Sequence, residues 1–227
     1  MLDTGTAMNV KLIAYTPQPE LVSAMAATLT HTKTKPEELQ QVKKKDLQKV
    51  LPYVMKLGHT SVVEHASFTF AISDVSRALT HQLVRHRIAS YSQQSQRYVN
   101  LTEPSYVVPP SIMKSKKTKK AYDETMGLIW EQYNNLLKLG IPAEDARYVL
   151  PNATCTNIMV TMNARSLLNF FELRCCLHAQ WEIRQCANKM LGEVRKIAPL
   201  IFKDAGPTCK TRRTCPENKK SCPLYPK

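Results

Sequence analysis

Hydrophobic and polar residues follow two different periods along this chain, which predicts a fold of mixed α and β type. Alternation at every second position, or enrichment in Thr, Ile and Val, indicates strands at residues 10–15, 67–73 and 154–162. Residues 106–108 form a shorter extended piece that two prolines close. These segments are the candidate strands of the fold.

Apolar residues recur three and four positions apart in other segments, as they do on one face of a helix. Asp74 and Asn163 are the expected N-caps of two helices, because short polar side chains accept hydrogen bonds from the first turn. Pro52 should bend one helix, and Gly58 and Gly140 should each end one. We expect helices at 19–29, 36–58, 75–84, 115–139, 142–150, 164–174 and 179–202. Residues 1–202 therefore read as one helix-rich α+β domain, followed by an irregular, basic, cysteine-containing tail at 203–227.

Composition adds limits to this picture. Of the 227 residues 43% are hydrophobic, which is enough to build a core. Residues 1–30 lack the features of a secretory signal, and no stretch of about 18 apolar residues follows, so we expect a cytoplasmic protein that does not bind membranes. The formal net charge is +14, with a local excess of +5 over residues 203–227. The lysine clusters contain no interleaved aromatics, which favours general attraction of anions over a nucleic-acid surface.

Glycine and cysteine usage narrows the possible chemistry. The six glycines lie too far apart for a dinucleotide-binding or P-loop motif, so a nucleotide has to be held by arginines, amides, hydroxyls and helix ends. The seven cysteines are an odd number without a regular framework, and we expect reduced thiols. The tail spacing C-x5-C-x6-C supplies only three ligands where zinc sites use four, so we expect no metal site. Cys175 and Cys176 are expected to fill apolar space as small hydrophobes.

Residues 85–97 form the most polar candidate site. This segment holds three arginines, three serines and three glutamines. No Asp or Glu lies between Asp74 and Glu103, so the arginines have no local partner. Guanidinium groups bind phosphate in a fork geometry, and amides and hydroxyls can bind a pyrimidine edge. An anionic ligand is favoured over the alternative, a solvated loop held by ion pairs.

The segment also carries a family signature. Arg85-His86-Arg87, seven residues and then Ser95 resembles the motif of the flavin-dependent thymidylate synthases. Three further segments resemble the same family in the same order: 58–65, 146–151 and 163–182. The resemblance covers most of residues 10–200. The alternative from another class is a basic nucleic-acid-binding protein with a cysteine-containing tail.

The resemblance implies a reaction and its partners. Enzymes of this family methylate dUMP to dTMP, with 5,10-methylenetetrahydrofolate as carbon donor and FAD, reduced by NADPH, as hydride source. Every one of these partners is an anion, which agrees with the basic composition. The resemblance also implies a central, mainly antiparallel sheet and a homotetramer whose sites form between subunits.

The family's functional positions transfer residue by residue. Those implied for dUMP are Gln82, Leu83, Val84, Arg85, Gln93, Gln94, Ser95, Gln96, Arg97, Arg147 and Arg174. Those implied for FAD are Ser61, Arg85, His86, Arg87, Asn163, Ala164, Arg165 and Asn169, and His59 is implied where folate or NADPH arrives. Family members often carry Glu at the position of Gln93, so a role that needs a carboxylate is in doubt there.

Arg174 is the expected catalytic residue. A permanently charged guanidinium against the uracil edge stabilises the N3-deprotonated ring and makes it more reactive. Ser95 has no assignable base beside it, so it is assigned to binding. If residues 163–174 are helical, eleven steps of about 100° return Arg174 to the face of Asn163, whereas Arg165 points the other way. Two binding directions on one helix favour a homo-oligomer.

Overall fold

The computed structural model describes residues 8–41 and 44–226, and their packing divides the chain into two compact units. Unit 1 contains Ile72–Arg85 and Ser92–Met159 together with the residues up to Asn9. Unit 2 contains Val10–Ala71, His86–Tyr91 and the chain from Val160 onward. Four of the five boundaries fall inside strands, and each unit is built from segments that are not consecutive in sequence.

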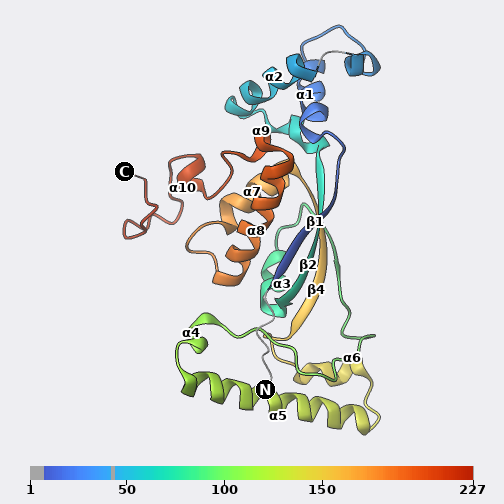
Figure 1. Cartoon of the computed structure of the whole chain (residues 1–227), viewed down its shortest axis with the longest axis vertical. Helices are drawn as coiled ribbons and strands as arrows, with labels where there is room; N and C mark the ends of the chain where they lie inside the picture. The colour runs from blue at the N-terminus through green and yellow to red at the C-terminus, as the bar shows by residue number, and fades with distance from the viewer. Residues whose placement is uncertain (1–7, 42–43, 227) are drawn as a thin grey trace. The chain divides into compact units, whose positions relative to one another are not determined.

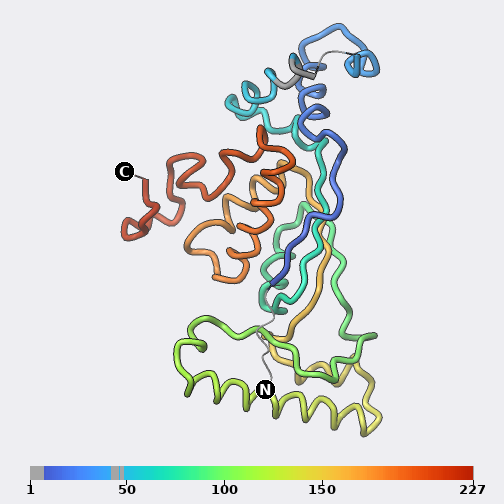
Figure 2. The backbone as a smooth tube through the Cα atoms, in the orientation of Figure 1, coloured from blue at the N-terminus to red at the C-terminus, as the bar shows by residue number. Residues whose placement is uncertain are grey.

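Four strands form one antiparallel sheet in the order β1-β2-β4-β3. They are β1 (Asn9–Tyr15), β2 (Ser67–Ser76), β3 (Ser90–Gln93) and β4 (Cys155–Asn163), and their course can be followed in Figure 1 and along the tube of Figure 2. The strands expected at 10–15 and 154–162 are confirmed to within one residue. β4 is buried on one face only, because Asn157 and Met159 are exposed while their neighbours are buried. β3 lies inside the polar segment, where no strand was predicted.

The start of α3 (Arg77–Leu83) corrects one predicted cap. Asp74 does not cap this helix but lies in β2 with φ +58°, a left-handed conformation that Asp adopts more readily than most residues. Ser76 is the N-cap, and its Oγ accepts a hydrogen bond from the Leu79 amide at 3.0 Å. Asp and Ser are both good N-cap residues, so the sequence alone does not choose between Asp74 and Ser76. The choice depends on where β2 ends.

Unit 1 is built around the long helix α5 (Lys116–Lys138), which is preceded by α4 (Pro110–Met113) and followed by α6 (Ala143–Ala146) and η3 (Arg147–Val149). Its core joins Trp130 and Met126 of α5 to Tyr106 of the predicted extended piece. The Trp130 indole N–H donates to the Leu101 carbonyl at 2.9 Å, so this buried polar atom is paired. The prediction of a helix at 115–139 is confirmed.

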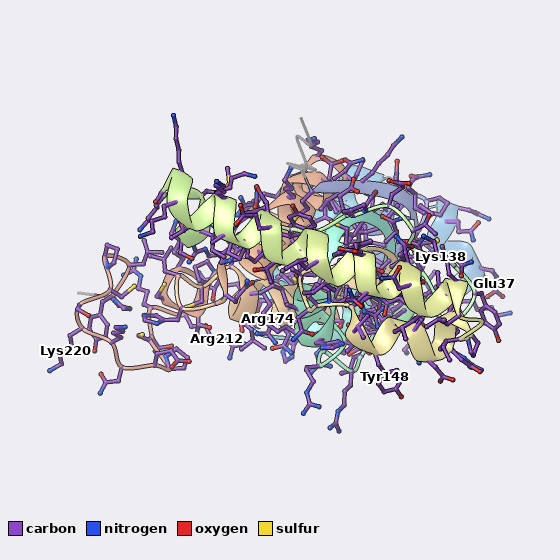
Figure 3. The ribbon with its side chains drawn as sticks, turned by 90° about the horizontal axis from the view of Figure 1, so that it is seen from below. Glu37, Lys138, Tyr148, Arg174, Arg212 and Lys220 are labelled. Atoms are coloured by element: carbon purple, nitrogen blue, oxygen red, sulfur yellow. The ribbon has the colours of Figure 1, made fainter. Side chains whose placement is uncertain are left out.

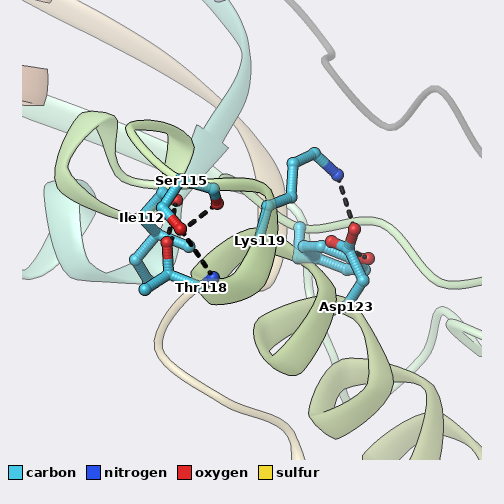
Figure 4. A network of polar contacts seen from close by, with 6 residues as sticks. Ile112, Ser115, Thr118, Lys119 and Asp123 are labelled. Atoms are coloured by element: carbon cyan, nitrogen blue, oxygen red, sulfur yellow. Dashed lines mark hydrogen bonds and ion pairs between the residues drawn. The ribbon is translucent and has the colours of Figure 1, made fainter.

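The first turn of α5 shows why the helix begins where it does (Figure 4). Ser115 Oγ accepts from the amides of Lys117 and Thr118, which satisfies two of the free N–H groups of the turn. Lys119 and Asp123 form an ion pair one turn further on, at 2.5 Å. At the other end Gly140 has φ +83°, the conformation that commonly ends a helix.

Unit 2 contains most of the helices. They are α1 (Pro19–Leu29), η1 (Pro36–Gln41), α2 (Lys44–Lys56), η2 (Thr60–His65), α7 (Ala164–Arg174), α8 (Trp181–Ile197), α9 (Pro199–Phe202) and α10 (Thr208–Thr211). Phe68 and Phe171 pack edge to face against Phe202, with ring centroids 5.5 and 6.1 Å apart. Each fully buried Phe contributes about 1.5–3 kcal/mol. These rings fix α7 and α9 against β2.

Two predicted helices differ from the structure. The expected helix at 36–58 is described as η1 and α2, and residues 42 and 43 lie outside the described residues. The expected helix at 179–202 breaks at Ala198 into α8 and α9, because Pro199 lacks the N–H that would continue the hydrogen bonding. None of the described helices is long and apolar enough to cross a membrane.

Candidate functional site

His86 is held in unit 2 by a chain of short hydrogen bonds. Its Nε2 lies 2.6 Å from Ser166 Oγ, and Ser166 Oγ lies 2.5 Å from the Ile88 carbonyl oxygen. Because a carbonyl can only accept, the serine hydroxyl donates to Ile88 and accepts from the histidine. His86 therefore carries its proton on Nε2. The Tyr91 hydroxyl donates to the His86 carbonyl at 2.7 Å, which fixes the backbone of the Arg-His-Arg motif.

Charge and burial then decide the protonation of this group. Burial lowers the pKa of His86 below its ordinary value, the nearby positive charge of Arg174 lowers it further, and the hydrogen bond to Ser166 acts in the opposite direction. Burial raises the pKa of Tyr91 to about 12, against a smaller opposing effect of Arg174. Arg174 thus lies near both side chains, and His86 is neutral at neutral pH.

Two of the expected phosphate-binding arginines contact the same residue of unit 1, Glu144, one at its carboxylate and one at its backbone carbonyl. Arg97 Nε pairs with Glu144 Oε2 at 2.9 Å, and Arg147 Nε donates to the Glu144 carbonyl at 2.9 Å. Ser95 Oγ accepts from the Arg97 amide at 3.1 Å. Arg97 has no partner close in sequence, as expected, but it pairs with a carboxylate 47 residues away that the sequence analysis did not foresee. Among the described residues, Arg85 forms no ion pair, and the same holds for Arg87.

Arg77 is a cationic residue near this cluster that the sequence analysis missed. Burial lowers the pKa of its guanidinium, and the positive charge of Arg147 lowers it further. Two arginines that repel each other in this way favour a bound anion. Arg77 is the first residue of α3, and only the strand end at Ser76 places it there. No local motif marks it.

The glutamines expected at the nucleotide are partly engaged in unit 1 itself. The Gln93 amide donates to Thr80 Oγ1 at 3.0 Å and to Thr156 Oγ1 at 3.3 Å. Gln94 Oε1 accepts from Asn157 Nδ2 at 3.1 Å. Leu83 is fully buried, so its side chain belongs to the core. The remaining expected nucleotide contacts in this unit, Gln82 and Gln96, are half-buried, and Val84 is exposed.

The residues expected at FAD surround the start of α7 in unit 2. Asn163 Oδ1 accepts from the Ser166 amide at 2.8 Å, which confirms the predicted cap. The Ala164 amide donates to the Ala66 carbonyl at 2.7 Å. Arg165 pairs with Glu64 of η2, a partner that the sequence analysis did not foresee. Three exposed residues complete the set expected at FAD and its partners: Asn169 on α7, Ser61 in η2 and His59 just before η2.

A pocket of about 300 Å³ opens beside the end of α7, and Arg174 is part of its lining. The connection from α7 to α8 forms one part of the wall, and the tail from Pro207 to Tyr225 forms the other. Figure 3 labels Arg174 together with Arg212 and Lys220 of the tail. The tail was expected to be an irregular extension, but it packs on the helix that carries the expected catalytic arginine.

One carboxylate attaches the tail to α7. Glu172 accepts from Arg212 through both of its oxygens, each at 2.9 Å, and from Thr211 Oγ1 at 3.2 Å. The Glu172 side chain is only 17% exposed. Two parallel hydrogen bonds from one guanidinium to one carboxylate are the strongest common form of ion pair. The anchor lies two residues before Arg174.

The cysteines fall into two groups. Burial raises the pKa of Cys175 and Cys186 to about 12, as expected of thiols that fill apolar space. Cys176 does not belong with them, because it is half-buried and lines the pocket. The pKa of Cys209 is raised by burial and then by Cys176 and Cys222, so Cys209 lies near each of the other two.

Comparison with known proteins identifies the family. Residues 11–200 match the family described as "Thymidylate synthase complementing protein". A protein of Geobacter sulfurreducens named flavin-dependent thymidylate synthase is 50% identical over 95% of this chain and 94% of its own. The chain belongs to the flavin-dependent thymidylate synthases. A synthase of the same name from Clostridium tetani is 49% identical over 95% of this chain and 93% of its own.

A solved structure agrees with the fold of the family. It is described as a UMP/dUMP methylase, PolB, from Streptomyces cacaoi bound with 5-Br dUMP. It matches 87% of this synthase and 93% of its own chain, with a TM-score of 0.73 and 24% sequence identity. This likeness confirms the predicted helix-rich α+β class with a central antiparallel sheet.

Proposed function

We propose that this protein methylates dUMP at C5 to form dTMP, with FAD, NADPH and 5,10-methylenetetrahydrofolate as the other participants. The observation that carries this proposal is the family match over residues 11–200, because it includes every segment quoted for the expected site. The relatives are named for the same reaction and for flavin dependence. They give no support to the alternative of a basic nucleic-acid-binding protein.

The nucleotide is assigned mainly to residues of unit 1. Arg97, Arg147 and Ser95 hold its phosphate, since two guanidinium groups and a hydroxyl meet around Glu144 there. Arg77 adds a third positive charge close to Arg147. The remaining contacts are assigned to Gln82, Leu83, Val84, Arg85, Gln93, Gln94 and Gln96. Of these, Leu83 can contribute only through its backbone, because its side chain is buried.

The flavin is assigned to the residues around α7 and the Arg-His-Arg motif. Reduced FAD supplies the hydride when it is bound. Neutral His86 presents a fixed ring face, and its partner Ser166 keeps it in one tautomer. Ser61 and Asn169 are exposed and can reach an anionic dinucleotide, as can Arg85 and Arg87, while Asn163 and Ala164 fix the start of the helix. Arg165 is exposed as well, and it would exchange its ion pair with Glu64 for the ligand. His59 is assigned to the side where folate or NADPH arrives.

Arg174 is assigned to the uracil ring. Its guanidinium stabilises negative charge that develops on the ring when N3 loses its proton, and it needs no proton transfer of its own. Arg174 is half-buried at the end of α7, and a charge in such a position acts more strongly than in bulk water. Ser95 binds and does not attack, because its Oγ accepts from a backbone amide and no base is placed beside it.

The assembly and location belong to the same proposal. We assign a cytoplasmic homotetramer in which each site draws residues from more than one subunit. Large exposed side chains next to the assigned nucleotide residues support such contacts, because Tyr98 is 81% and Tyr148 is 83% exposed. Residues 1–202 would carry the catalytic fold, and the tail at 203–227 would complete it.

A direct assay tests this function. The purified protein should be yellow, should bleach when NADPH is added without oxygen, and should convert dUMP to dTMP only when methylenetetrahydrofolate is present. Chromatography of the nucleotide product measures the conversion. A colourless protein that does not take up added FAD would refute the proposal, and tight salt-dependent binding of oligonucleotides would favour the alternative.

A further inference from the structure

Four of the seven cysteines line the pocket beside Arg174. They come from two segments that are distant in the sequence: the connection after α7, and the tail. These residues are Cys176, Cys209, Cys215 and Cys222. The other three cysteines are buried and do not line it: Cys155, Cys175 and Cys186.

The structure supplies a ligand that the sequence pattern lacked. The tail alone offers three thiols at spacing C-x5-C-x6-C, one fewer than a four-cysteine metal centre needs. Cys176 joins them from the α7–α8 connection. Cys209, Cys215 and Cys222 line the same pocket as Cys176. Three thiols from the tail and one from the helical body therefore face a common space.

We propose that Cys176, Cys209, Cys215 and Cys222 bind an iron–sulfur cluster in this pocket. On binding, each thiol releases its proton to solvent and its sulfur donates to one iron, and no change of oxidation state is needed. Four cysteine thiolates are the usual ligands of such clusters. The cluster would occupy the space between the tail and the end of α7.

The size of the pocket favours a cluster over a single ion. A single zinc ion holds four sulfurs about 2.3 Å from itself, so the sulfurs converge closely. Among the described residues, no group of three or more His, Cys, Asp or Glu side chains is arranged to hold a metal ion. A cluster with bridging sulfides keeps its four thiolates further apart and requires a hollow, and this pocket has a volume of about 300 Å³.

The charge around the pocket suits an anionic centre. A cluster that binds four thiolates carries net negative charge, and Arg174 lines the same pocket. Lys210 and Arg213 lie between the first two tail cysteines, Cys209 and Cys215, in a segment whose formal excess is +5. Positive charge near a group of thiolates stabilises them together, as it does a single reactive thiolate.

The tail is held firmly enough to provide fixed ligands. Glu172 binds Arg212 and Thr211 at the start of the tail. Before that point, Arg195 of α8 donates to the carbonyl oxygens of Phe202 and Ala205 at 3.1 and 2.6 Å. Both anchors precede Cys215 and Cys222, so the chain enters the pocket wall from a fixed position. Preorganised ligands bind a metal centre at lower entropic cost.

Metal analysis of the whole protein tests the proposal. Protein purified without oxygen, or reconstituted with equal amounts of ferrous and ferric iron and with sulfide and then desalted, should contain about four iron and four sulfide per chain. Low-temperature electron paramagnetic resonance after reduction with dithionite identifies the cluster, because flavin dominates the visible spectrum. Retention of no iron, or of one zinc without sulfide, would overturn the proposal.

Matched variants locate the ligands. Cys209→Ser and Cys215→Ser should each lose at least half of the iron and sulfide, whereas Cys155→Ser, at a buried thiol outside the pocket, should keep both. Equal loss in all three would contradict the assignment. Circular dichroism checks that each variant is folded, and reconstitution of the unaltered protein decides the question if one is not. Flavin content and dTMP formation are measured separately, so a failure of the proposed reaction does not affect the metal result.

Discussion

At the residue scale, Arg174 combines a permanent charge with a half-buried position near His86 and Tyr91. The family resemblance led to this arginine, and the structure adds the pocket that contains it. Its neighbour in sequence, Cys175, is buried, so the two side chains leave the helix end in different environments. The half-buried Arg174 guanidinium is accessible to a ligand, whereas the buried thiol of Cys175 is not.

The first prediction concerns the charge of Arg174. Arg174→Ala should lower kcat for dTMP formation by at least about a hundredfold, the effect of removing one group that stabilises developing charge. The flavin spectrum should be largely unchanged. Steady-state assays and absorption spectra measure the two effects, and Arg184→Ala on α8 is the control. Activity within a few-fold of the unaltered enzyme would exclude a catalytic role.

The second prediction concerns His86. Because its pKa in the folded chain lies below that of the unfolded chain, the unfolded state binds more protons between the two values. This group therefore contributes stability above about pH 6.5, and that contribution is lost as the pH falls toward the folded pKa. The melting temperature should decrease between pH 7 and pH 5.

A variant isolates the contribution of His86. In His86→Gln the decrease between pH 7 and pH 5 should be smaller, because the amide does not titrate. His31→Gln, at an exposed turn, is the matched control and should keep the slope of the unaltered protein. Scanning calorimetry across this range provides the melting temperatures. An identical slope in all three proteins would show that His86 is not the group responsible.

At the element scale, the tail depends on its attachment to α7. Glu172→Gln removes the charge that holds both nitrogens of Arg212, which should cost about 1 kcal/mol, or roughly fivefold in the population of detached tail. Trypsin should then cut after Lys210, Arg212 and Arg213 several times faster.

Mass spectrometry of the fragments reports the cleavage. Glu193→Gln is the control, because its partner Lys196 lies three residues further along the same helix and is exposed. It should leave the rate of tail cleavage unchanged. Equal rates for Glu172→Gln and the unaltered chain would mean that other contacts hold the tail.

The elements also show how far the sequence alone can lead. Strong periodicity predicted α1, α5 and α7 closely, and the cap at Asn163 is where it was expected. The cap at Asp74 was misplaced, because Asp and Ser both suit that position and the strand pairing that extends β2 is a long-range effect. The break between α8 and α9 at Pro199 was missed, because the apolar stripe of α8 continues beyond it.

The residues of the candidate site also fall into those that the sequence predicted and those that it missed. Motif residues were found because they are close in sequence, whereas Glu144, Glu64 and Arg77 were missed because their partners are distant. The role of the tail was missed for the same reason. Its three cysteines are one ligand short until the fold brings Cys176 to the pocket.

At the scale of the whole molecule, the net charge of +14 attracts anions, which agrees with the anionic partners proposed for this protein. The arginines assigned to the nucleotide lie mostly in unit 1, and those assigned to the flavin lie mostly in unit 2. Each unit is built from segments that are not consecutive in the sequence. One chain therefore presents two sets of cationic side chains. An assembly of several chains would multiply the contacts available to each ligand.

The last prediction therefore concerns assembly. The protein should sediment as a tetramer, and activity per chain should fall on dilution to concentrations at which the tetramer dissociates, because each site needs residues of more than one subunit. Analytical ultracentrifugation and assays over the same concentration range test this together. An active monomer would refute the shared site.

The position of the pocket wall has a consequence for biosynthesis. Residues from Pro207 to Tyr225 leave the ribosome after the sheet and the long helices, yet they enclose the space beside Arg174. A nascent chain can fold its sheet and its long helices while that side is still open. A premature stop codon just before Pro207 would keep the sheet and the long helices but remove that wall, so such a lesion would resemble a mutation beside Arg174 more than the loss of a loose end.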